Sequence, residues 1–175
     1  MLYNHRRIMA DRKVHYEAAF EAYLRGMGVP CVVVDEARKA VFANARLKNF
    51  DFVVYSRKGP NLLVDVKGRQ LRRRRQGGHA TFQTWATQKD VEDLMQWQQV
   101  FGDGFVAVLA FVYWIDPPLI PENGMFEYRD RWYWILGVDL AAYRNAMRRR
   151  SAKWETVCLP AAEFRSLARP LEQWL

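Results

Sequence analysis

The feature that most constrains the fold is an unbroken apolar run, FVAVLAFVYWI, at residues 105–115. It is too short to cross a bilayer as a helix, which takes about 20 residues. Its β-branched and aromatic residues instead predict a strand that is covered on both faces. We therefore expect this strand in the centre of a sheet.

An amphipathic helix is expected near the start of the chain. Its apolar residues recur at the spacing of one helical face, and Gly26, Gly28 and Pro30 then end the pattern. The residues of this stripe are Tyr16, Ala19, Phe20, Tyr23, Leu24 and Met27.

Three strands are predicted between this helix and the central strand. CVVVDE at 31–36 is a β-branched run, and FDFVVY at 50–55 and NLLVDVK at 61–67 flank the turn sequence SRKGP. The last two segments should form an antiparallel hairpin. The Arg- and Gly-rich stretch 68–83 that follows is expected to be an exposed loop.

The remaining pattern predicts a second helix from Thr87 to Phe101, with Thr87 and Asp90 as a capping box. Further elements are a strand at 131–138, a helix at 139–150 capped by Asp139, a short strand around Val157 and an amphipathic tail. The order helix, three strands, helix, strand predicts one mixed α/β domain over 1–175. Its core would span about 11–115, with about four to five strands in the central sheet, and 116–175 would be appended to it.

Charge narrows the choice of partner. Lys and Arg outnumber Asp and Glu by 27 to 19, which favours nucleic acid first and an acidic membrane surface second. A membrane role is not expected, because no basic amphipathic helix with a clear Lys/Arg face is present. Cys31 and Cys158 are expected to be buried free thiols in a reducing cytoplasm.

Two acids and a lysine stand out on the predicted hairpin. Alternation places Asp65 and Lys67 on one face of their strand, and Asp51 can lie opposite Asp65 on the partner strand. Two carboxylates this close repel each other unless a cation lies between them, and their oxygens suit Mg²⁺ or Mn²⁺. Glu17 is at the border of the first helix's apolar stripe, where a third carboxylate could reach the metal or its water.

Glu17 in HYEAAFEAYLRGMGVP, Asp51 in FDFVVY, and Asp65 with Lys67 in VDVKG together resemble the pattern of the PD-(D/E)XK nuclease superfamily. The resemblance covers roughly the first 115 residues and is strongest to Holliday-junction resolvases and restriction-endonuclease-like repair nucleases. Two positions depart from the family pattern: Phe50 replaces its proline, and Asp65 replaces its commoner glutamate.

The resemblance implies a restriction-endonuclease-like fold and a divalent-metal-dependent nuclease that acts on DNA in repair, recombination or restriction. Asp51 and Asp65 would be metal ligands, Glu17 an auxiliary ligand, and Lys67 catalytic near the attacking water. By analogy with the family, the protein could act as a homodimer. The substrate's structure and the choice between endonuclease and exonuclease action stay open.

Basic and polar residues next to this site are candidates for nucleic-acid binding. They are Arg69, Arg72, Arg73, Arg74 and Arg75 after the catalytic strand, and Gln88 and Lys89 at the start of the second helix. Trp85 could stack on a base, whereas Arg148 to Arg150 are accounted for by the dipole of the helix they would end. The alternative hypothesis is a non-catalytic nucleic-acid-binding protein that keeps the nuclease fold.

Overall fold

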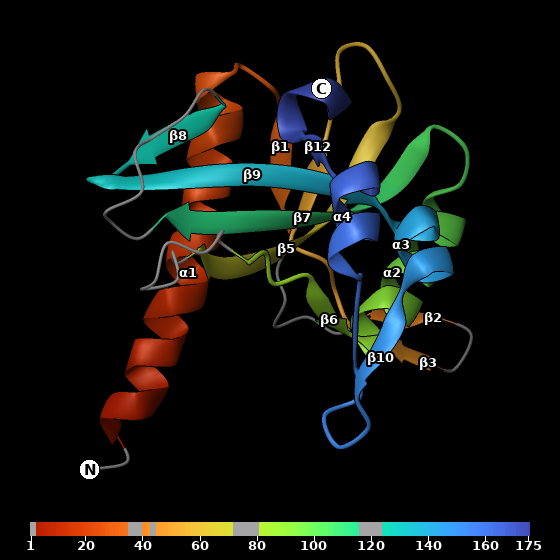
Figure 1. The fold of residues 1–175 in the computed structure, drawn as a ribbon. Coiled ribbons are helices and arrows are strands. Elements are labelled where there is room, and N and C mark those ends of the chain that lie inside the picture. Colours follow the sequence, from red (N-terminus) through yellow and green to blue (C-terminus); the bar gives the residue numbers. More distant parts are fainter. Residues whose placement is uncertain (1–2, 35–39, 43–44, 72–80, 116–123) are drawn as a thin grey trace.

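The structure is a computed structural model that describes residues 3–34, 40–42, 45–71, 81–115 and 124–175. Side chains are described in these ranges except in 3–14, 40–42 and 45–46. Figure 1 shows a large twisted sheet with helices on both faces and a smaller sheet beside it.

Within the described residues the main sheet has seven strands in the order β1-β4-β5-β7-β9-β12, with β8 paired to the first four residues of β9. β5 and β7 run parallel, and the other described pairs in this sheet are antiparallel, so the sheet is mixed. Its strands are β1 (Cys31–Val33), β4 (Phe52–Val54), β5 (Asn61–Leu71), β7 (Phe105–Ile115), β8 (Met125–Tyr128), β9 (Arg131–Asp139) and β12 (Arg169–Pro170).

Four α-helices and two smaller sheets complete the described elements. The helices are α1 (Tyr3–Gly26), α2 (Gln88–Phe101), α3 (Leu140–Ala146) and α4 (Ala161–Leu167), and a 3-10 helix covers Leu171–Trp174. One small sheet contains β10 (Arg148–Ser151), β11 (Thr156–Cys158) and β6 (Trp85–Thr87), and the other pairs β2 (Ala40–Phe42) with β3 (Ala45–Leu47). None of the described helices is both long enough and apolar enough to span a membrane.

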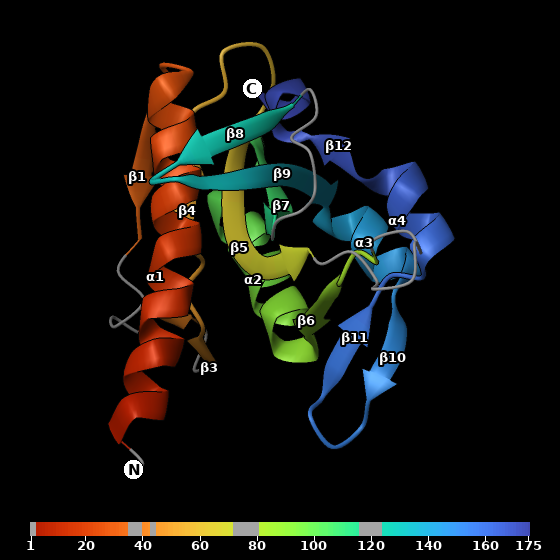
Figure 2. The same ribbon diagram turned by 60° about the vertical axis from the view of Figure 1, so that its left-hand side comes forward.

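The apolar run of 105–115 forms β7, between β5 and β9, as its composition predicts. Its side chains alternate between two cores. Leu109, Phe111 and Tyr113 pack with α2, α3 and α4, whereas Val108 and Val112 pack with α1. Figure 2 shows α1 on one side of β5 and α2 on the other. Burial on both faces explains why this strand carries no polar residue.

The first helix and the hairpin agree with the sequence predictions. Ala19, Phe20 and Leu24 are fully buried, but Met27 is 45% exposed because α1 ends at Gly26 and the chain turns away. In the hairpin, β4 pairs antiparallel with β5 in the register Phe52↔Val64. The capping box is also present, with the hydroxyl of Thr87 accepting from the backbone N–H of Asp90.

Three predictions differ from the structure. The segment 68–71 is not a loop, because β5 continues to Leu71 alongside β7, which is equally long. The helix predicted over 139–150 ends at Ala146, since Arg148–Ser151 pairs with β11 instead. The sheet exceeds the predicted four to five strands because β8, β9 and β12 add to the core.

Gly68 lets α1 approach β5 closely. A Cβ atom at this position would lie 2.2 Å from Cδ2 of Tyr16, in the middle of that ring's contact with the strand. Since real Cβ atoms do not come that near to other atoms, a larger side chain at residue 68 would have to push the helix or the ring away.

We therefore expect Gly68→Ala to lower the free energy of unfolding by about 1–3 kcal/mol through overpacking. Gly26→Ala is the matched control, because a Cβ there would meet no atom within 4 Å. Urea denaturation followed by circular dichroism measures both. Equal stability of the two variants would contradict the close packing of α1 on β5.

Candidate active site

Asp65 and Lys67 lie on the face of β5 that α2 covers, in the same layer as Leu63 and Leu71. They are buried, at 6% and 8% exposure. The Lys67 ammonium lies 2.6 Å from Oδ2 of Asp65. The structure thus brings these two predicted residues together, on the face that strand alternation predicts.

Asp51 is adjacent to them across the hairpin. The register Phe52↔Val64 places Asp51 opposite Asp65 if it is continued by one residue. The backbone N–H of Asp51 donates to the carbonyl of Val64 (2.9 Å), and its Oδ2 accepts from the N–H of Val66 (2.5 Å). The Asp51 carboxylate therefore bonds to the backbone of β5 just beyond Val64, the last residue of β5 that pairs with β4.

Beyond Asp65, the described part of β5 is paired only with β7, so its other edge is open. A pocket of about 520 Å³ lies along this edge, between α1, the loop before β6 and the start of α2. Its lining residues are His15, Tyr16, Glu17, Val66, Lys67, Gly68, Arg69, Gln70, Gln83, Trp85, Asp90 and Trp114. A space of this size is in the range of small-molecule sites.

Glu17 belongs to α1, which covers the opposite face of the sheet from Asp65. It lines the open-edge pocket together with Lys67, but Asp51 and Asp65 are not among the residues that line it. The structure therefore places Glu17 and Lys67 around the same pocket. Its predicted part in metal binding stays a prediction.

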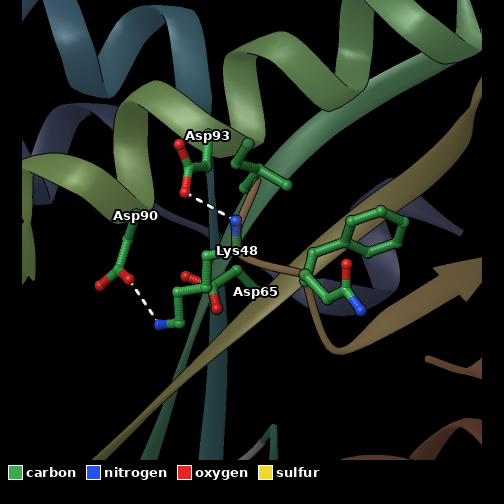
Figure 3. A pocket seen from close by; sticks show the side chains of 7 residues that line it. Lys48, Asp65, Asp90 and Asp93 are labelled. Atoms are coloured by element: carbon green, nitrogen blue, oxygen red, sulfur yellow. Dashed lines mark hydrogen bonds and ion pairs between the residues drawn. The ribbon is translucent and has the colours of Figure 1, made fainter. Parts of the chain in front are cut away.

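Sequence reasoning missed Asp90 as a site residue, because it identified this aspartate only as a helix cap. Asp90 Oδ2 accepts a hydrogen bond from Lys67 (2.8 Å) and another from the backbone N–H of Thr87 (3.1 Å). Its Oδ1 accepts from Lys48 (2.6 Å), as Figure 3 shows. One carboxylate thus holds two lysines and also caps α2.

These contacts determine the charge states of Lys67 and Asp90. Burial opposes the charge of Lys67, but the carboxylates of Asp65 and Asp90 outweigh it and raise the pKa of Lys67 above its ordinary value. Burial likewise opposes ionisation of Asp90, but Lys67 and Lys48 outweigh it and lower the pKa of Asp90. At neutral pH Lys67 is therefore a positive group that can stabilise negative charge, not a general base.

Lys48 and Asp93 complete the buried polar cluster. The backbone N–H of Lys48 donates to Oδ2 of Asp93 (2.8 Å), which also forms an ion pair with Lys89 (2.8 Å). The space that these groups line measures about 10 Å³, about the size of one water molecule. Figure 3 shows the side chains around it. Lys48 comes from the chain just before β4, and only the folded structure brings it to α2.

The residues predicted to contact nucleic acid differ in their exposure, and some lie outside the described residues. Arg69 is half-buried, with its guanidinium donating to the backbone oxygens of Gly68 and Trp85 and lying 3.9 Å from the Trp85 ring centroid. Gln88 and Lys89 are exposed on the first turn of α2, where Gln88 donates to Glu92. Arg72, Arg73, Arg74 and Arg75 lie outside the described residues. All of these roles stay predictions.

The carboxylates can be tested for their fit to a divalent metal. Within the described residues, no group of three or more His, Cys, Asp or Glu side chains is placed to hold a metal ion. Mg²⁺, however, is usually held by one or two carboxylates together with water and substrate phosphates. Asp65 Oδ2 is buried beside the Lys67 ammonium, 2.6 Å away, and an ionised carboxylate has further lone pairs with which it could also bind a metal. Asp51 and Asp65 therefore fit a magnesium ion in number and chemistry.

Comparison with solved structures identifies the fold. The chain matches Hjc, a Holliday junction resolvase from the archaeal hyperthermophile Archaeoglobus fulgidus, with a TM-score of 0.55. The match covers 92% of this chain and 98% of the resolvase, at 12% sequence identity. The chain has the restriction-endonuclease-like fold. The fold predicted from Glu17, Asp51, Asp65 and Lys67 is thereby confirmed. No protein-family model and no curated protein matches the sequence.

Replacing Asp90 tests the cluster itself. We expect Asp90→Ala to lower the free energy of unfolding by about 3–5 kcal/mol, because it leaves the buried Lys67 without one of its two carboxylates. Asp103→Ala is the control, since Asp103 is exposed in the turn after α2. Thermal and urea unfolding of both variants would show the difference. A loss below about 1 kcal/mol for Asp90→Ala would contradict a structural role of this pair.

Proposed function

We propose that the protein is a divalent-metal-dependent nuclease that hydrolyses phosphodiester bonds in DNA. The observation that carries this proposal is the buried pair of Asp65 and Lys67 at the open edge of β5, with Asp51 opposite. The neighbouring residues Leu62, Leu63, Val64 and Val66 are buried and apolar, so packing of this part of β5 does not need two charged groups. The fold shared with a Holliday junction resolvase supports the same function.

In this proposal Asp51 and Asp65 hold a Mg²⁺ or Mn²⁺ ion. When bound, the metal supplies an activated water and neutralises charge on the phosphate. Both aspartates are positioned by β-structure, Asp65 by the central part of β5 and Asp51 by its bonds to Val64 and Val66. Such rigid support keeps ligand geometry fixed when substrate arrives.

Lys67 supplies positive charge to the reacting phosphate. Lys67 lines the open-edge pocket and its ammonium is held by Asp65 and Asp90, so little reorganisation is needed when negative charge builds on phosphorus. Glu17 lines the same pocket from α1 and is proposed as an auxiliary contact to the metal's water. DNA enters along this edge, which the basic side chain of Arg69 also lines.

The first test is cleavage of labelled single-stranded, linear duplex, nicked and four-way-junction DNA with Mg²⁺, Mn²⁺ or EDTA. We expect cleavage by the wild type only with a metal, and a loss of about a hundredfold or more in Asp65→Asn, because a ligand is lost. Asp103→Asn is the matched control. Circular dichroism should show that all three proteins are folded.

Two results would contradict the nuclease proposal. One is equal cleavage by the wild type and Asp65→Asn, which would place the activity elsewhere or in a contaminant. The other is binding of DNA that weakens with salt, while none of the four substrates is cut with either metal. That second result would favour a non-catalytic nucleic-acid-binding protein on this fold.

A further inference from the structure

The hairpin of β10 and β11 extends away from the main sheet. Figures 1 and 2 show its turn at the outer end of the molecule, below β6 and the start of α2. Its other end is fixed by pairing of β11 with β6, in the register Cys158↔Trp85 to Thr156↔Thr87. The backbone N–H of Gln88 also donates to the carbonyl of Glu155 (2.8 Å), so the turn is tied to α2.

The hairpin is strongly basic. Over 148–158 it carries Arg148, Arg149, Arg150 and Lys153 against the single acid Glu155, which gives a net charge of +3. All three arginines are exposed, and none is paired with a carboxylate in the part of the chain that the structure describes. A helix dipole cannot explain them, because they lie on a strand. Unpaired positive charge on a protruding element is typical of a surface that binds a polyanion.

An exposed tryptophan lies in the turn of the same hairpin. Trp154 is 69% exposed, more than any other described large hydrophobic residue. Its backbone N–H donates to the hydroxyl of Ser151 (3.3 Å), and the ammonium of Lys153 lies 5.4 Å from its ring centroid. A solvent-facing indole beside cationic groups has the chemistry that stacks on unpaired bases in single-stranded nucleic acid.

The inner end of the hairpin reaches the open-edge pocket. Arg150 is the bulged residue of β10, because the register shifts between Arg149 and Ser151. Bulges re-aim side chains next to active sites, and here the guanidinium of Arg150 lies 5.2 Å from the ring centroid of Trp85, which lines the pocket. Arg150 therefore lies beside a residue that lines the open-edge pocket.

Arg150 and Arg69 place two positive charges on the same indole ring. Burial lowers the pKa of Arg69. The buried Nε of Arg69 has no hydrogen-bond partner among the described residues. Two like charges and an unsatisfied donor at the rim of a pocket are relieved when a phosphate binds between them.

We propose that the β10–β11 hairpin is a DNA-binding arm for substrates that contain unpaired bases. Arg148, Arg149 and Arg150 contact backbone phosphates that lead into the open-edge pocket, and Trp154 stacks on a base exposed at a single-stranded or branched segment. This inference rests on the proposed function for the identity of the nucleic acid, and it adds the class of DNA structure that the enzyme selects.

Binding without cleavage tests the arm independently of catalysis. Fluorescence anisotropy in EDTA would compare labelled single-stranded DNA, a four-way junction and a fully paired duplex of equal length. The variants are Trp154→Ala and the double variant Arg148→Ala/Arg149→Ala. Tyr55→Ala and Lys58→Ala are matched controls, because both residues are exposed in the β4–β5 turn, at the other end of the molecule.

Trp154→Ala should weaken binding of single-stranded DNA roughly 5- to 150-fold, because one base loses its stacking partner, and should affect the paired duplex less. The double arginine variant should weaken binding of all three DNAs. It should also reduce the slope of log affinity against log salt concentration by about 2 on duplex. The two control variants should bind like the wild type.

Three outcomes would contradict the proposed DNA-binding arm. They are equal affinity of the arm variants and the controls, failure of the wild type to bind any of the three DNAs, and conversion of a wild-type dimer to a monomer by Trp154→Ala without a change in DNA affinity. The last would identify the arm as a contact between two copies of the chain. If cleavage depends on Asp65 but the arm variants bind DNA like the wild type, the proposed arm is wrong and the proposed nuclease activity stands. If the arm variants bind DNA more weakly but no substrate is cleaved, the proposed nuclease activity is wrong and the proposed arm stands.

Discussion

The candidate site depends on the two buried ion pairs of Lys67. Its ammonium lies between the carboxylates of Asp65 and Asp90. A buried lysine is tolerated only when opposite charges repay the loss of its hydration, and two carboxylates do so here. Because Asp65 lies on β5 and Asp90 on α2, the pair also fixes the first turn of α2 against the sheet. The geometry of the candidate site and the docking of α2 on the sheet are thus coupled through the side chain of Lys67.

The open edge of β5 follows from the same part of the fold. β7 supports the full length of β5, whereas β4 pairs only with its first half, and Asp51 caps the point where pairing stops. The exposed edge leaves space between α1 and the β6–α2 connection, and the pocket lies there. The basic β10–β11 hairpin is attached here, because β11 pairs with β6. The basic hairpin therefore lies beside Trp85, which lines the same pocket as Lys67.

Much of the fold and part of the site could be predicted from the sequence, since both depend on local periodicity. The apolar stripe of α1 and the hairpin with Asp65 and Lys67 on one face required only helix and strand spacing. Asp90 and Lys48 were missed because they reach the site across 23 and 42 residues of sequence, and no local pattern marks such contacts. β10 was missed because Arg148 to Arg150 follow a helical pattern, and their pairing with β11 is decided by tertiary structure.

Anomalous diffraction from wild-type crystals grown or soaked with Mn²⁺ would show whether Asp51 and Asp65 bind a metal ion. If Asp51 and Asp65 bind the metal, an anomalous peak should lie within bonding distance of their carboxylate oxygens, with the Lys67 ammonium still bound to Asp90. No peak at these two carboxylates, in crystals that bind Mn²⁺ elsewhere or not at all at millimolar metal, would contradict it. The buried acids would then be a structural ion-pair cluster of the fold.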